Sequence, residues 1–506
     1  MKPILLNDIM IGILSSVQSI TEVIPEVIAG SAAPLIFLIL ALIVIWNCKF
    51  RSSPPGPSFC MGIGPIVSYI HFLWKGIGKA CNYYNDKYGE FVRVWIMGEE
   101  TLIISRPSAA YNVLKHAGYC SRFGNEFGLQ CVGMRENGII FNNNPDSVKQ
   151  IRPIFMKALT GSRLHNVTAV SVASTKAYLE RLDQVTDNGQ VNVLKLARLI
   201  VLDINNKLFL RVPLDENEIL GKIQNYFDSW QTLLLKPHLF FKFSWLYKKH
   251  EENAQELRMS MKNLIMKKRQ SIAESEKLEE DTDFATDLIF AQDHGDLTSE
   301  NVCQCLLEMM IAAPDTMSVS LYFIFMLIAQ HPDVQEGLIE EIKTVSGDNE
   351  VENSDLPQMK LMESCINEAM RYMPVVDIIM RRAMEDNVID GHYIKKGTNV
   401  ILNIKRMNRN EFFPKPNEFS LQNFETAVPN RYFQPFGSGP RACVGKHIAM
   451  VMMKVITATL LKKYKLHTLD GRTVDDIKNI NNLSQHPEEP QSRLEMIFIA
   501  RRKANP

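Results

Sequence analysis

Residues 436–445 read Phe-Gly-Ser-Gly-Pro-Arg-Ala-Cys-Val-Gly, and this stretch decides how the rest of the sequence is interpreted. Gly437 and Gly439 can adopt backbone conformations closed to other residues, so a tight loop is predicted here. The loop carries Cys443 just before a helix predicted over about residues 446–464. A helix N-terminus favours negative charge, and it therefore favours the thiolate form of a nearby cysteine.

A thiolate held in such a loop is a suitable ligand for haem iron, where it pushes electron density towards bound dioxygen. Arg441, two residues before the cysteine, is spaced to reach an anionic haem propionate. A buried cysteine in an ordinary turn explains the isolated Gly-x-Gly-x-Arg-x-Cys pattern equally well. The interpretation therefore depends on other parts of the chain.

A second segment is a helix predicted over about residues 360–373. It carries Glu368 and Arg371 three residues apart, on one face of the helix. Arg431 lies twelve residues before the cysteine. The three side chains are expected to form a buried ion network, in which the loss of one member is costly. Alone, such an ExxR pattern is weak, because most pairs of this kind are solvated.

A third segment is a long apolar helix, capped at Thr298 or Ser299 and predicted to end near Gln330. Pro314 within it removes a backbone donor and is expected to open the helix. Asp315 and Thr316 follow directly, so an acid and a hydroxyl stand at the opening. They are expected to deliver protons to oxygen bound at the iron.

Composition predicts a globular protein without a nucleic-acid role. The 506 residues are 46% hydrophobic and 22% charged, with zero formal net charge, and no nucleic-acid recognition motif is evident. The nine cysteines show no paired CxxC spacing, which favours reduced thiols in the cytosol. A hairpin is predicted within residues 89–105, turning about Gly98-Glu99, and a strand at 399–403. The fold is therefore expected to be mainly α, with a smaller β-rich part.

The N-terminal region predicts a membrane anchor. Residues 27–46 are almost wholly apolar and have about the 20 residues that cross a bilayer as a helix. Lys49 and Arg51 follow them, which places the C-terminal side in the cytoplasm. The domain prediction is a luminal segment at 1–26, a transmembrane helix at 27–46, a proline-rich linker at 47–57 and a catalytic domain at 58–506.

The order of these segments resembles the cytochrome P-450 superfamily. Within it, IAAPDTMSVSL at 311–321, MRYMPVVDIIMRRA at 370–383 and EFFPKPNEF at 411–419 look like steroid aromatases. The resemblance covers about residues 54–500. It implies the cytochrome P-450 fold, haem b with a cysteine thiolate, and three oxidations of the angular methyl group of androgens, giving oestrogens.

The resemblance also implies partners and a location. Dioxygen is the oxidant, and electrons come from NADPH through a flavoprotein reductase. The expected location is the endoplasmic reticulum membrane, in contact with lipid and with a cytosolic catalytic domain. Lys446, Lys454, Lys462 and Lys463 are expected to face the reductase. Two alternatives remain: another steroid hydroxylase, and a haem-binding sensor without turnover.

Site residues follow from the resemblance position by position. Cys443 is the axial ligand, and the other haem contacts are Arg122, Arg152, Arg381 and Arg441 at the propionates, with Ala312. Asp315 lies beside the A-ring ketone, Thr316 activates oxygen, Arg198 and Glu308 supply protons, and the Met380 N–H reaches the far ketone. The steroid is enclosed by an apolar wall of Ile140, Phe141, Phe227, Trp230, Ala312, Val376, Leu483 and Ser484.

Three positions depart from the family pattern. Val148 stands where a tryptophan is usual, and Ala442 and Lys405 each stand where a glycine is usual. These departures are expected to affect haem affinity and turnover more than the identity of the reaction.

Overall fold

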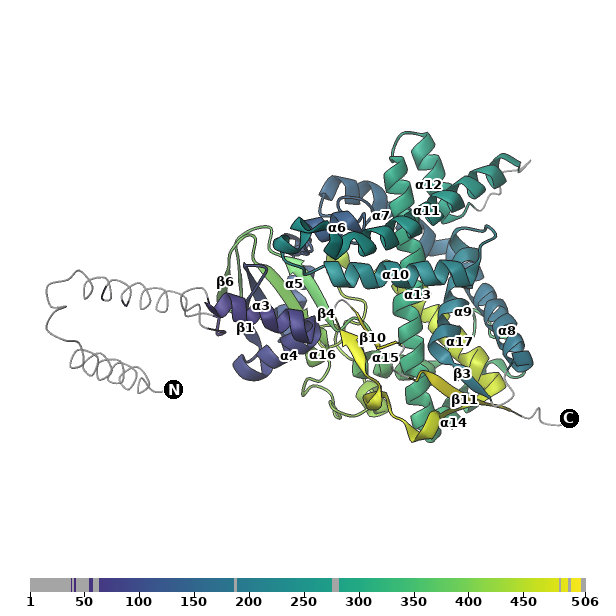
Figure 1. The fold of residues 1–506 in the computed structure, drawn as a ribbon. Helices are drawn as coiled ribbons and strands as arrows, with labels where there is room; N and C mark the ends of the chain where they lie inside the picture. The colour runs from purple at the N-terminus through teal and green to yellow at the C-terminus, as the bar shows by residue number, and fades with distance from the viewer. Residues whose placement is uncertain are drawn as a thin grey trace.

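The computed structural model describes residues 54–57, 63–185, 189–274, 282–481, 484–489 and 493–501, together with Leu38 and Ala41. The described chain is mainly helical with a small β part, as expected. In Figure 1 the main sheet and the first helices lie on one side, and the larger helical part lies on the other. Apart from Leu38 and Ala41, the predicted transmembrane helix at 27–46 lies outside the described residues.

The bounds of the elements are as follows. The helices are α3 (Ile63–Lys75), α4 (Ile77–Tyr88), α5 (Pro107–Lys115), α6 (Glu126–Cys131), α7 (Pro145–Leu159), α8 (Val167–Val185), α9 (Val193–Phe209), α10 (Glu216–Leu233), α11 (Ser244–Glu274), α12 (Phe284–Asp293), α13 (Ser299–Gln330), α14 (Pro332–Ser346), α15 (Lys360–Tyr372), α16 (Ile404–Met407) and α17 (Lys446–Lys463). The strands are β1 (Phe91–Ile96), β2 (Glu99–Ile104), β3 (Gln190–Asn192), β4 (Ile378–Arg382), β5 (Asn387–Ile389), β6 (His392–Ile394), β7 (Asn399–Asn403), β8 (Tyr464–Thr468), β9 (Asn479–Asn481), β10 (Gln485–Pro487) and β11 (Glu495–Ala500).

Helix α13 is the central element, and α9, α10, α11, α15 and α17 all pack against it. The Thr298 hydroxyl accepts the Asn301 N–H at its start, which confirms the predicted cap. The helix is long and apolar enough to cross a membrane, but 83% of its most apolar window is buried inside the molecule. It is therefore a core helix. It runs through Pro314 without a break, so the expected opening is absent, because tertiary packing on most sides holds the helix together.

The main sheet has the strand order β1-β2-β7-β4. β1 and β2 form the predicted hairpin, turning at Met97 and Gly98, which both have positive φ. β7 pairs parallel with β2 and antiparallel with β4. β4 is thus an edge strand of this sheet, and it carries Met380 and Arg381 to the cavity described below.

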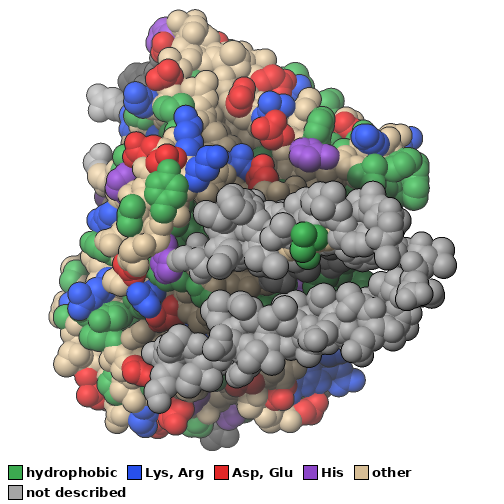
Figure 2. All heavy atoms as spheres, turned by 90° about the vertical axis from the view of Figure 1, so that its left-hand side faces the viewer, with side chains coloured by type: hydrophobic (Ala, Val, Ile, Leu, Met, Phe, Trp, Pro, Cys, Tyr) green, Lys and Arg blue, Asp and Glu red, His purple; other side chains and the backbone are tan. Residues whose placement is uncertain are grey.

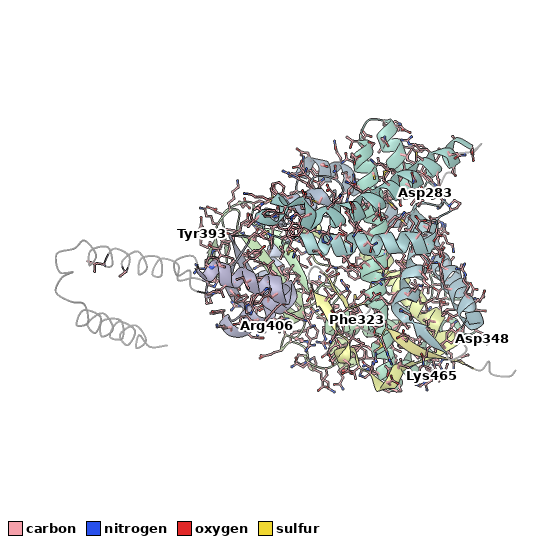
Figure 3. The ribbon with its side chains drawn as sticks, in the orientation of Figure 1. Asp283, Phe323, Asp348, Tyr393, Arg406 and Lys465 are labelled. Atoms are coloured by element: carbon pink, nitrogen blue, oxygen red, sulfur yellow. The ribbon has the colours of Figure 1, made fainter. Side chains whose placement is uncertain are left out.

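Three smaller sheets complete the described β part. β3, β11 and β8 form a three-stranded sheet, and β9 with β10 and β5 with β6 form two-stranded ones. The Gln485 N–H donates to the Val375 carbonyl (2.7 Å), which fastens β10 to the segment before β4. In Figure 3, the labelled Tyr393 and Arg406 lie on the side of the main sheet, and Asp348 and Lys465 lie at the opposite side of the molecule.

Candidate active site

A cavity of about 410 Å³ lies between the middle of α13, the segment before α7, β4 and the loop before α17. Most of its lining is apolar, and it collects residues from widely separated parts of the chain. The expected wall and contact residues that line it are Ile140, Phe141, Phe227, Trp230, Ala312, Thr316, Val376, Met380 and Ser484. Leu483 lies outside the described residues.

The cysteine loop has the conformation that its glycines predict. Gly437 and Gly439 have φ of 67° and 72°. A Cβ on Gly439 would lie 2.0 Å from the Leu114 carbonyl oxygen, so glycine is required there. The Cys443 N–H donates to the Phe436 carbonyl (2.9 Å), which closes the loop just before α17.

Cys443 points its thiol towards the cavity, to which the side chain is accessible. Burial raises the pKa of the Cys443 thiol. The Gly445 N–H and the guanidinium groups of Arg122 and Arg152 lower it. These groups are the ones that stabilise a thiolate. A bound metal ion favours the same form, because only a deprotonated thiol is a good ligand.

Four arginines, Arg122, Arg152, Arg381 and Arg441, line the same cavity. Burial lowers the pKa of each guanidinium, to about 10 for Arg381. Among the described residues none of the four forms an ion pair with a carboxylate, and the Arg122 Nε is buried without a hydrogen-bond partner. Buried positive charge without a counter-ion is costly, so the cavity is suited to an anionic ligand.

Haem provides both a partner for the thiolate and negative charge for the arginines. Its iron accepts a thiolate ligand, and its two propionates supply the negative charge that the arginines lack. Cys443 and the four arginines therefore fit the cofactor that the sequence predicted. The Ala442 carbonyl accepts a hydrogen bond from Arg152 (3.2 Å), so Ala442 holds one of the four arginines through its backbone. Val148 lies partly buried on α7, four residues before Arg152.

Thr316 and Asp315 are neighbours on α13, but only Thr316 lines the cavity. The Thr316 hydroxyl lines the cavity and donates to the Ala312 carbonyl (2.6 Å). Asp315 is not among the lining residues; it is buried behind them, and its Oδ2 has no hydrogen-bond partner in the described part of the chain. Burial raises the pKa of this carboxyl to about 6, against the positive charges of His486 and Arg198.

Glu308 holds the segment that forms one wall of the cavity. Its Oε2 accepts the N–H groups of Ile139 (2.7 Å) and Ile140 (3.1 Å), and burial raises the pKa of the carboxyl to about 7. On the other side of this segment, Arg122 donates to the Ile140 carbonyl (2.9 Å) and Arg441 to the Ile139 carbonyl (3.0 Å). Residues 139–140 are thus held by hydrogen bonds to one carboxyl group and two guanidinium groups.

Arg198 is buried and pairs with Glu489 at 2.7 Å, a partner that the sequence did not suggest. Within the described residues, no hydrogen bond joins Arg198 or Glu308 to Asp315 or Thr316. The described residues thus contain no direct hydrogen-bonded route from Arg198 or Glu308 to Thr316, and proton supply by these two residues stays a prediction.

The structure adds a contact between α10 and β10. The Gln231 amide nitrogen lies 2.8 Å from the His486 Nε2, and the rings of Phe227 and His486 lie 6.3 Å apart. The two segments are separated by 255 residues, so no local spacing could have revealed the contact. It connects the cavity wall on α10 to the C-terminal β strands.

Glu368 and Arg371 form the expected ion pair, with distances of 2.6 and 2.8 Å and no exposed surface. Arg371 also donates to the carbonyl groups of Asn408 (2.9 Å) and Pro416 (2.8 Å). Arg431 is not part of this network: it is exposed, with its guanidinium over the ring of Tyr432. Glu368 and these carbonyl groups satisfy the donors of Arg371, so the network is complete without a second guanidinium.

Glu368→Gln should lower the free energy of unfolding by about 3 kcal/mol or more, because it leaves the buried Arg371 guanidinium without a counter-charge. Thermal and chemical unfolding of the purified protein measure the effect. Glu411→Gln, a change at an exposed carboxylate, is the matched control and should be neutral. Equal stability of the two variants would contradict a structural role for the pair.

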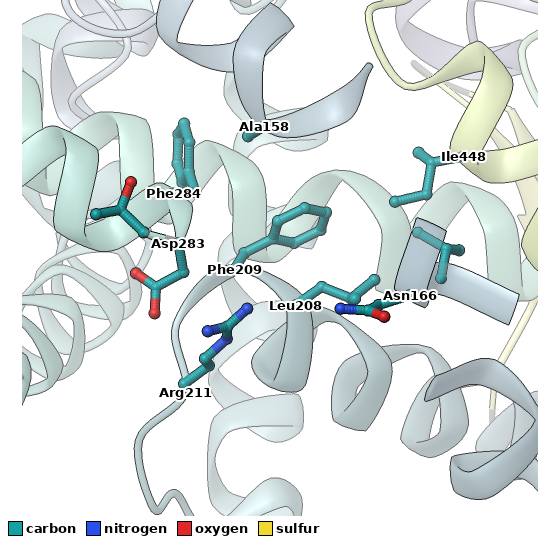
Figure 4. Close-up of a pocket in the computed structure, with 10 residues that line it drawn as sticks. Ala158, Asn166, Leu208, Phe209, Arg211, Asp283, Phe284 and Ile448 are labelled. Atoms are coloured by element: carbon teal, nitrogen blue, oxygen red, sulfur yellow. The ribbon is translucent and has the colours of Figure 1, made fainter. Parts of the chain in front are cut away.

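A second pocket, of about 20 Å³, lies behind the cavity and shares Phe209 and Ile448 with it. Figure 4 shows it between the end of α9 and the start of α12, with Arg211 and Asp283 at its rim. It has room for about one water molecule. It is too small for an organic substrate, so the larger cavity is the candidate active site.

A cysteine thiol and four arginines that have no carboxylate partner among the described residues surround one apolar cavity in a mainly helical fold with a small sheet, and these features define a haem-thiolate monooxygenase. The cytochrome P450 family model matches residues 54–494. The chain belongs to the cytochrome P450 family.

Curated relatives refine this assignment. Proteins named aromatase match from Taeniopygia guttata (58% identity over 488 residues), Gallus gallus (58% over 486) and Homo sapiens (56% over 484). Each match covers 96% of this chain and 96% of the relative. The similarity therefore extends over nearly the whole length of both proteins.

Proposed function

We propose that the protein is an aromatase, which oxidises the angular methyl group of androgens three times and yields oestrogens. It would convert androstenedione to oestrone and testosterone to oestradiol. The observation that carries the proposal is the 56–58% identity over 96% of the chain to proteins of that name. The apolar cavity beside Cys443 is consistent with a rigid, mostly apolar substrate.

The bound haem supplies oxygen activation, with dioxygen as oxidant and electrons from NADPH through a flavoprotein reductase. The residues of this chain do the rest. Cys443 holds the iron and the four arginines hold the propionates. The apolar wall excludes water and orients the steroid, and the Thr316 hydroxyl assists oxygen activation.

Two polar groups are proposed to bind the two ends of the steroid. The Asp315 carboxyl lies behind the cavity lining, so its side chain has to turn towards the cavity to donate a proton to the A-ring ketone, and this donation requires the neutral acid. β4 is an edge strand of the main sheet, so alternate N–H groups of β4 are not used by β7. We assign the Met380 N–H to the ketone at the far end.

A membrane location agrees with the surface of α3. Its exposed apolar side chains are Ile66, Val67, Ile70, Leu73 and Trp74. Figure 2 shows this side of the molecule, where apolar side chains lie among charged ones. The proposal is a single-pass protein of the endoplasmic reticulum, with a luminal segment at 1–26, a transmembrane helix at 27–46, a linker at 47–57 and a cytosolic catalytic domain at 58–506.

One of the four lysines expected to face the reductase, Lys454, was wrongly predicted. Lys454 is buried and donates to the Leu356 carbonyl (3.0 Å) and to Glu363 (2.9 Å). Lys462 and Lys463 donate to backbone carbonyl groups, those of Gly347 (3.1 Å) and Leu179 (3.3 Å). Lys446 alone of the four is exposed without such a contact in the described chain. A reductase surface near Cys443 therefore cannot use Lys454, while Lys446 and the partly exposed Lys462 and Lys463 stay predicted contacts.

Incubation with the reductase, NADPH and androstenedione tests the function. We expect oestrone, recognised by its phenolic A-ring in mass and absorbance spectra, and no product without NADPH. A hydroxylated steroid that keeps the A-ring enone would instead identify another steroid hydroxylase. Haem binding without any product would identify a binding protein.

A further inference from the structure

Lys405 lies just after β7, at the start of the short helix α16, and its side chain is mostly enclosed. Its Nζ donates to the Gln485 Oε1 at 2.8 Å. Its backbone N–H donates to the Asp377 carbonyl (3.1 Å), just before β4. One residue is therefore bonded both to the segment that leads into β4 and to β10.

Gln485 is almost fully buried, with 1% exposure, and its own N–H donates to the Val375 carbonyl (2.7 Å). Side chains alternate across a strand, so the neighbours of Gln485 face the other side of β10. Ser484 lines the cavity, and His486 contacts Gln231 and Phe227 on the α10 wall. The Lys405 contact thus holds β10 from behind, while the opposite face of the strand closes the cavity.

The burial of Lys405 makes loss of its hydrogen bond to Gln485 energetically unfavourable. Burial lowers the pKa of its ammonium group, and the nearby Asp377 carboxylate acts in the opposite direction. A buried charge without a hydrogen-bond partner is unfavourable, so the ammonium holds the Gln485 side chain firmly. Lys405 is not among the residues that line the cavity, so it acts on the cavity only through β10.

We propose that Lys405 is a positioning residue, which fixes β10 against the cavity through Gln485 and thereby sharpens the discrimination between steroids of different size. The inference rests on the proposed function, since it assigns the discrimination to steroids. A glycine at this position, usual in the resembling family, has no side chain with which to make this contact. The departure at Lys405 therefore concerns the substrate side of the site and not the affinity for haem.

Lys405→Met keeps most of the side-chain volume and removes the donor. Amide hydrogen exchange at Gln485 and Glu488, whose N–H groups bond to Val375 and Lys478, should become about tenfold faster or more. Titration of the haem absorbance should show that affinity for androstenedione falls relative to that for progesterone, which is bulkier, by about tenfold. Haem content should stay unchanged.

Three further variants make the test specific. Gln485→Leu should reproduce the effect, and the double variant should be no worse than either single one, because all three break the same contact. Gln485→Glu keeps an acceptor and adds a complementary charge, so it should slow exchange. Lys395→Met, at an exposed lysine, is the matched control and should change nothing.

Additive effects of Lys405→Met and Gln485→Leu would overturn the proposal. So would equal losses of affinity for both steroids, which indicate a general loss of stability. The exchange measurement does not require oestrogen formation. A protein that makes no oestrogen but shows the exchange change would refute the proposed function and leave the positioning role in place.

Discussion

Asp315→Ala should bind haem normally and lose oestrogen formation by about a hundredfold or more, which is the range for removal of a general acid. Burial raises the pKa of Asp315 to about 6, so most of the acid is neutral below pH 6 and about a tenth of it is still neutral at pH 7. A neutral carboxyl can donate to the A-ring ketone and assist its enolisation, whereas a carboxylate cannot. Single-turnover product analysis, normalised to haem content, measures the loss.

The Asp315→Asn variant distinguishes two roles of Asp315: donating a hydrogen bond to the ketone and transferring a proton to it. It keeps an N–H donor, so it should bind androstenedione better than the alanine variant and still fail to aromatise it. Oestrogen formation and androstenedione affinity of the native protein should both fall as pH rises through about 6, where the acid ionises, whereas the androstenedione affinity of the asparagine variant should show no such step. Substantial oestrogen output from both variants would show that Asp315 only supports the helix around Pro314.

Cys443→Ala should abolish the haem-thiolate spectrum and all turnover. The structure brings this thiol alone among the described cysteines to the lining of the cavity with the arginines. The reduced carbon-monoxide spectrum measures the change, since the red-shifted band requires a thiolate ligand.

Cys131→Ala, at a partly exposed cysteine on α6, is the control for Cys443→Ala and should keep the band. Survival of the band in Cys443→Ala would mean that another cysteine holds the iron. Unfolded protein is distinguished by its circular dichroism, and Cys443→His offers a folded variant with a different axial ligand, which should also lack the band.

The features that were predictable from sequence depend on short-range signals. The Thr298 cap, the proline that begins α14, and the glycines about Cys443 each act within a few residues, so helix ends and the loop could be located. The hairpin of β1 and β2 was predictable for the same reason, because Gly98 marks its turn. The positions of the cavity residues followed from the resemblance, since they come from segments far apart in the chain.

What could not be predicted are the partners of long polar side chains. Arg431 was expected in the buried network, yet carbonyl groups of residues 408–418 satisfy Arg371 instead. Lys454 was expected at the surface, yet it is buried against Glu363 of α15. The pairing of Arg198 with Glu489 is of the same kind. Each depends on a loop or helix whose position is fixed only when the whole core is packed.

The hydrogen bonds from two arginines to residues 139–140 are expected to link the binding of haem to the binding of steroid. Arg122 and Arg441 donate to the carbonyl groups of these residues and are the proposed propionate partners, while Ile140 lines the same cavity, where the steroid is proposed to bind. Propionates bound to the two guanidinium groups would hold these side chains in place and so order the wall segment that they contact, so haem should raise the affinity for steroid beyond the contact between the two molecules. Linkage is reciprocal, so bound steroid should retard haem loss by the same free energy. When haem is scarce, the enzyme molecules with bound androgen should therefore retain haem in a larger fraction than those without it.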